Sequence, residues 1–269
     1  MKFVIDHDLH IHSQLSLCSD DPEQTPACIL EYAVKSGLKH ICLTDHYWDA
    51  HVPLHTDFDF YARQDYERVT RALPLPQAEG VTFHFGVETD MDKFMTVGVS
   101  KAELDKFEFI IIPTTHLHMT GFTLDEADTS LEARARLYIE RMEAVLAMDL
   151  PFAKIGIAHP TCDLLAPGEW ENHLAVLDLI SDEDLHRVYA RAAEVGVGIE
   201  LNMPIFQYSE ADLPRVLRPY KIARTCGCKF YLGSDAHHPT ELDEDAIDRF
   251  VRMTELLELR EEDKFRPFG

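Results

Sequence analysis

The sequence predicts an α/β fold, a (β/α) barrel that residues 1–269 form as one domain, and three observations support this prediction. The length of 269 residues suits a single barrel. Hydrophobic residues make up 46% of the chain, enough to fill a core. Short apolar runs alternate seven times with helix-like stretches, which favours a barrel over an open sheet.

The strand candidates are short runs that are mostly apolar on both faces. This pattern is typical of parallel strands that helices cover on either side. We place the strands at residues 2–9, 40–44, 81–87, 108–113, 154–158, 197–201 and 229–233.

The helix candidates lie between these runs and carry recognisable ends. The first begins after Thr25, a good N-cap, and stops before Gly37. Another begins after Ser181 and stops at Gly196. The helices are expected at residues 26–35, 128–148, 182–195, 210–225 and 241–257, with Pro219 as a candidate break in the fourth. Residues 47–60 and 161–172 are expected to be loops over a site, and the charged tail 260–269 to be peripheral.

The charge balance limits the possible partners. The chain has 48 Asp and Glu residues but only 25 Lys and Arg residues, so the formal net charge is −23. Such a surface repels nucleic acids, yet a small anionic substrate remains compatible if bound cations reverse the field within a pocket. No apolar run reaches the ~18 residues of a membrane span. The six cysteines form no Cys-x-x-Cys motif, which favours a reducing cytoplasm.

Each predicted strand is followed by side chains that can bind metal. His10 and His12 point to the same face if the chain is extended there. In a barrel, the carboxyl ends of all strands converge on one face. The later strands lead into His46, Glu88, His116 and His118, His159, Glu200 and Asn202, and Asp235 and His237. This mixture of imidazole and carboxylate suits Zn, Mn or Fe, and it is too large for one ion, so two to three divalent ions are expected.

The order of these motifs resembles the PHP (polymerase and histidinol phosphatase) family. The match runs from Asp8-Leu9-His10-Ile11-His12 through Thr44-Asp45-His46 to Gly233-Ser234-Asp235-Ala236-His237. The resemblance implies a distorted (β/α)7 TIM-like barrel with a trinuclear metal site. It also implies a metal-dependent phosphoesterase that hydrolyses a small phosphomonoester by metal-activated hydroxide, with histidinol phosphate as one family substrate.

The resemblance further implies a distribution of ligands. His10, His12, Glu88 and Asp235 would hold one ion, and Glu88 would bridge to a second ion held by His116 and His159. His46 and His237 would hold the third. The family usually places one more ligand for this ion shortly after the H-x-H motif. Here Asp20 is preferred, with Asp21 and Cys18 as alternatives.

Roles beyond ligation follow from position. Asp235 is expected to accept a proton from the attacking water, and the catalytic set is Asp235, His237 and Glu88. Asp8 and Asp45 would orient imidazole ligands by hydrogen bonding. The substrate candidates are His118, for which an outward-facing loop position is an equal alternative, and Asn202. Arg134, Arg136 and Arg141 are expected on an exposed helix face.

Two other functions fit the same cluster. One is amide or lactone hydrolysis of the amidohydrolase type, which typically uses a carboxylated lysine. No lysine stands at a strand end and Glu88 takes the bridging place, which favours phosphate esters. The other is a non-catalytic metal-binding domain, but degenerate sites lose ligands and here nearly all are present. The expected partner is a small phosphorylated molecule, without nucleic acid or membrane.

Overall fold

The computed structural model describes residues 1–56 and 59–268, and its centre is a parallel sheet of seven strands in sequence order. Two backbone hydrogen bonds join the ends of this sheet, from Asp235 N to the His10 carbonyl (2.7 Å) and from His12 N to the Ala236 carbonyl (3.0 Å). The sheet is therefore a nearly closed barrel, which confirms the predicted (β/α)7 TIM-like fold. The strands are β1 (His7–Ile11), β2 (His40–Leu43), β3 (Thr82–Glu88), β4 (Phe109–Pro113), β5 (Ile155–Ala158), β6 (Gly198–Leu201) and β7 (Lys229–Leu232).

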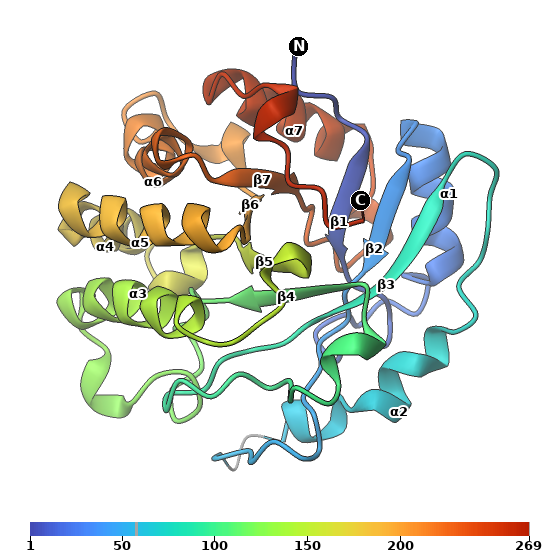
Figure 1. Ribbon diagram of the computed structural model, residues 1–269, viewed down its shortest axis with the longest axis horizontal. Coiled ribbons are helices and arrows are strands. Elements are labelled where there is room, and N and C mark those ends of the chain that lie inside the picture. The colour runs from blue at the N-terminus through green and yellow to red at the C-terminus, as the bar shows by residue number, and fades with distance from the viewer. Residues whose placement is uncertain (57–58, 269) are drawn as a thin grey trace.

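Helices surround the strands on the outside (Figure 1). Thr25 caps α1 by accepting a hydrogen bond from Cys28 N, and Gly37 ends it with a φ of 70°. The helices are α1 (Pro26–Ser36), α2 (Tyr66–Val69), α3 (Leu131–Leu146), α4 (Glu171–Leu179), α5 (Asp182–Val195), α6 (Leu213–Cys226) and α7 (Glu244–Leu256). None of the helices among the described residues is long and apolar enough to cross a membrane.

The structure departs from the predicted elements at two places. The short helices α2 and α4 were not predicted. The N-cap residue of α4 makes no side-chain hydrogen bond, so the sequence lacks the usual signal for the start of this helix. Pro219 lies inside α6 without ending it, because Val216, Leu217 and Tyr220 bury the helix against the core. Residues 57 and 58 of the expected loop 47–60 lie outside the described residues.

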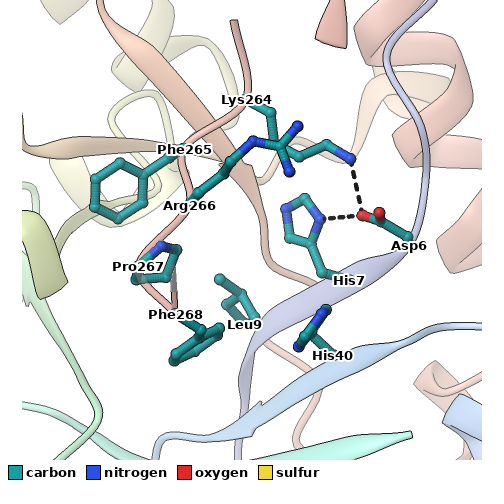
Figure 2. Close-up of a pocket in the computed structure, with 9 residues that line it drawn as sticks. All are labelled: Asp6, His7, Leu9, His40, Lys264, Phe265, Arg266, Pro267 and Phe268. Atoms are coloured by element: carbon teal, nitrogen blue, oxygen red, sulfur yellow. Dashed lines mark hydrogen bonds and ion pairs between the residues drawn. The ribbon is translucent and has the colours of Figure 1, made fainter. Parts of the chain in front are cut away.

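The C-terminal tail is not peripheral, contrary to the prediction. Phe265 is 7% exposed and packs in a cluster with Phe109 and Tyr231. The Nζ of Lys264 lies 2.9 Å from a carboxylate oxygen of Asp6, and Figure 2 marks this ion pair with a dashed line. The tail thus covers the amino-terminal ends of the strands. The prediction rested on the charged residues of the tail, but Phe265 and Phe268 pack their rings at the base of the barrel.

Phe265→Ala is expected to lower the free energy of unfolding by about 3 kcal/mol, because it leaves a cavity among buried rings. Urea denaturation would measure this loss. Phe206→Ala is the matched control, since Phe206 is 62% exposed and should change stability little. Equal stability of both variants would contradict the role given to the tail.

Candidate metal centre

Four of the predicted ligands meet inside the barrel at the carboxyl ends of the strands. Asp235 Oδ1 lies 3.2 Å from His10 Nε2 and 3.1 Å from His12 Nε2. The two Nε2 atoms are 3.1 Å apart. Glu88 Oε2 lies 3.5 Å from His10 Nε2 and 3.3 Å from His12 Nε2. The side chains of His10, His12 and Glu88 are buried, so these atoms face one another away from water.

Glu88 also belongs to a second group. Its other oxygen, Oε1, lies 3.4 Å from His159 Nε2, and the ring of His159 stacks on His116. Ligand atoms of Glu88, His116 and His159 all lie within 4.8 Å of one another. The two oxygens of Glu88 therefore face two separate sets of imidazoles, as a bridging carboxylate requires.

A third group consists of His12, Cys18, His46 and His237, whose ligand atoms lie within 4.8 Å of one another. The structure corrects the preference for Asp20. The Asp20 carboxylate is 91% exposed and lies 3.7 Å from His238, outside the cluster. The loop after β1 therefore places Cys18 in the cluster and Asp20 outside it.

Hydrogen bonds at Nδ1 fix the direction of five imidazoles. The Nδ1 of each ring lies within hydrogen-bond distance of a protein oxygen, so with the proton on Nδ1 the lone pair of Nε2 is left for the cluster. The Ser16 hydroxyl donates to Asp45 Oδ1 (2.8 Å), which leaves it an acceptor for His12. The pairs are His10 with Glu200 Oε1 (2.7 Å), His12 with Ser16 Oγ (3.0 Å), His116 with Asp90 Oδ2 (2.8 Å), His159 with Thr115 Oγ1 (3.0 Å), and His237 with the Asp235 carbonyl (2.7 Å).

The cluster has more acceptors than donors. Three of its buried atoms, Glu88 Oε1, His159 Nε2 and Asp235 Oδ1, have no hydrogen-bond partner among the described residues. Buried polar atoms without partners are costly, and lone pairs at these distances repel one another. Divalent cations would satisfy all of them, and the mixed imidazole and carboxylate donors fit Zn, Mn or Fe.

The pKa shifts of the metal-free protein also indicate a site for cations. Burial by itself would lower the pKa of His12, but the carboxylates of Asp235 and Glu88 beside its Nε2 outweigh it and raise the pKa to about 9. Burial would raise the pKa of Asp235, but the charges of His10 and its neighbours hold it far below the usual range. The cluster therefore attracts positive charge, which protons supply when metal does not.

The remaining predicted residues take different positions. His118 lines a cavity over the cluster, whereas Asn202 is not among the described residues that line it. Asp45 acts on His12 through Ser16. Among the described residues, Asp8 has no hydrogen bond to an imidazole: it accepts from Ser234 N (2.9 Å), from the Tyr32 hydroxyl (3.2 Å) and from the backbone N of His10 (3.4 Å). The expectation that Asp8 orients a ligand is thus corrected, and its contact with Ser234 fixes the backbone just before Asp235.

Two carboxylates that orient the proposed ligands through contacts with Nδ1 were not predicted as such from the sequence. Asp90 is fully buried, contacts His116 Nδ1 and accepts from the Tyr61 hydroxyl (2.7 Å). Its position two residues after Glu88 could have revealed it, because residues two apart share a face of an extended chain. Glu200, for which ligand orientation was not foreseen, contacts His10 Nδ1 and accepts from His159 N at 2.6 Å.

The arginines of α3 are only partly as expected. Arg136 is exposed, but Arg134 is 7% exposed and Arg141 is fully buried. Arg141 donates to the carbonyls of Thr114 (2.9 Å) and Met91 (2.8 Å). Arg134 and Arg141 lie two turns apart on the inner face of the helix, so the exposed-face expectation is wrong for both.

Comparison with solved structures identifies the fold. The chain matches histidinol phosphate phosphatase from Lactococcus lactis, solved with zinc, L-histidinol and phosphate, with a TM-score of 0.61. The match covers 97% of this chain and 98% of the other, at 18% sequence identity. The chain has the fold of that phosphatase. The likeness to histidinol phosphate phosphatase that the motifs suggested is thereby confirmed in the architecture of the barrel.

Other comparisons add less. A probable 2-pyrone-4,6-dicarboxylic acid hydrolase from Acinetobacter baumannii matches over 97% of both chains, with 12% identity and a TM-score of 0.44. That similarity is too low to support an argument. No family model and no curated protein matches the sequence.

Proposed function

We propose that this protein is a metal-dependent phosphoesterase that hydrolyses a small phosphomonoester. The observation that carries the proposal is the shared carboxylate of Glu88, which faces two groups of imidazoles at the carboxyl ends of the barrel strands. The fold agrees, since it is that of a phosphatase solved with zinc and phosphate.

The residues divide into three sets. His10, His12, Glu88 and Asp235 would hold one ion, and Glu88, His116 and His159 a second. Cys18, His46 and His237, next to His12, would hold a third. Bound divalent ions would lower the pKa of a water molecule and neutralise the phosphoryl oxygens.

The protein's own groups prepare this chemistry. Glu200 and Asp90 hold the rings of His10 and His116, so that the ligands need no rearrangement. Asp235 stays ionised within the cluster, so its carboxylate is the group that would accept a hydrogen bond from the attacking water. The Nδ1 of His237 faces the Asp235 backbone carbonyl, which couples the ring to the same segment.

The amidohydrolase alternative has less support. No lysine is among the described residues that line the cavity over the cluster. Glu88 stands where a carboxylated lysine would have to bridge. Phosphate ester hydrolysis therefore remains the function that this donor set favours.

An assay with p-nitrophenyl phosphate tests the proposal. Protein purified without chelator should hydrolyse the ester, lose activity with a chelator, and regain it when Zn, Mn or Fe is added back. A metal-loaded protein that hydrolyses no phosphate ester would contradict the proposal.

Cys18 offers a separate test of the third site. Loaded with Co(II), the protein is expected to show a thiolate-to-cobalt charge-transfer band, because a cysteine ligand is deprotonated on binding. Cys18→Ser should abolish the band, and Cys28→Ser should retain it, since Cys28 lies on α1 as its third residue. A band that persists in Cys18→Ser would exclude Cys18 as the ligand.

A further inference from the structure

The cavity over the metal centre has an unusual second wall. Its volume is about 500 Å³, and proposed ligands form part of its lining. The other described lining residues, together called the second wall, are Phe60, Tyr61, His118, Met119, Thr120 and Leu164. A substrate whose phosphate reaches the ions must place its organic part against this second wall.

Apart from the imidazole of His118, no described residue of this second wall has a charged side chain. The Tyr61 hydroxyl is already donated to Asp90, so Tyr61 offers the cavity its ring. The ring of His118 meets the ring of His116 edge to face, with the ring centroids 5.2 Å apart. The only carboxylates among the described lining residues are Glu88 and Asp235, and both face the metal groups. No lysine or arginine is found among those residues either.

Charged organic groups would therefore find no partner. An ammonium group moved from water to this wall would lose hydration without gaining a carboxylate, and a second phosphate would gain no lysine or arginine. An uncharged apolar group loses nothing comparable and gains contact with the rings of Phe60 and Tyr61 and with Met119 and Leu164.

Resting on the proposed function, we infer that the substrate is a phosphomonoester of an uncharged, apolar alcohol, up to the size of an aromatic ring. Bound ions would hold the phosphate, and the second wall selects the organic part by excluding charge. Histidinol phosphate, which carries an ammonium group, is then a poor substrate, although its phosphatase shares this fold.

Two matched pairs of esters test this inference. Propyl phosphate and 2-aminoethyl phosphate differ in one terminal group of similar size, and phenethyl phosphate and histidinol phosphate compare larger groups. We expect kcat/KM to be at least about 100-fold higher for the uncharged member of each pair, because desolvating an unpaired ammonium is costly. Equal or reversed values would overturn the inference and leave the proposed function intact. Hydrolysis of neither member by the metal-loaded protein would overturn both.

A variant of the wall gives an independent measurement. Leu164→Asp places a carboxylate in the cavity and should shift the ratio of kcat/KM by about tenfold toward the ammonium-bearing esters. Leu179→Asp is the control, because Leu179 is 50% exposed at the end of α4 and should leave the ratio unchanged. An unchanged ratio in Leu164→Asp would show that the wall does not select the substrate.

Discussion

Replacement of Glu88 by glutamine is expected to lower kcat on p-nitrophenyl phosphate by about 10³-fold and to release at least one ion from the protein. Glutamine keeps the volume, but it has one oxygen in place of two and no charge. The two carboxylate oxygens face different imidazole groups, 3.3 Å from His12 and 3.4 Å from His159, so that no neutral side chain can serve both. The size of the loss follows from removing a charge aimed at the reacting centre.

The measurement combines steady-state kinetics with elemental analysis of the same sample. Glu67→Gln is the matched control, because the Glu67 side chain is 84% exposed and should change neither quantity. Retention of the full metal content and near-normal kcat in Glu88→Gln would contradict the bridging role.

Replacement of Arg141 by methionine should lower the free energy of unfolding by about 3–5 kcal/mol. The guanidinium is fully buried, donates to the carbonyls of Thr114 and Met91, and lies 3.7 Å from Asp90. Methionine would leave these carbonyls and the Asp90 carboxylate without their cationic partner. Because Asp90 also contacts His116, metal affinity should fall as well.

Urea denaturation of the metal-free protein separates the stability effect from metal binding. Arg136→Met on the same helix is the control, since the Arg136 side chain is half exposed and should change stability by no more than about 0.5 kcal/mol. Equal unfolding midpoints for the two variants would show that the buried guanidinium does not organise this part of the barrel.

The parts of the site that could be predicted are those tied to the strand ends. His10, His12, Glu88 and Asp235 come together because parallel strands in a barrel end on one face, a rule that needs only the positions of the strands. The choice between Cys18 and Asp20 needed the path of a loop, which no periodicity describes. The structure places Cys18 in the cluster and Asp20 outside it, which the residue types do not reveal.

Other features depended on contacts distant in sequence. Arg141 was predicted to lie on the surface, but it is buried and donates hydrogen bonds to the carbonyls of Thr114 and Met91. Phe265 lies among charged residues in the sequence, yet it enters the base of the barrel. In both cases, the tertiary environment reversed a prediction based on local composition.

The central claim is that the cluster holds divalent ions, and counting them tests it most directly. Elemental analysis of protein purified without chelator should find two to three divalent ions per chain, and their removal should lower the melting temperature, because the unpartnered atoms of Glu88, His159 and Asp235 would lose their cations. A protein that binds no divalent ion, even after reconstitution with Zn, Mn or Fe, would contradict the claim.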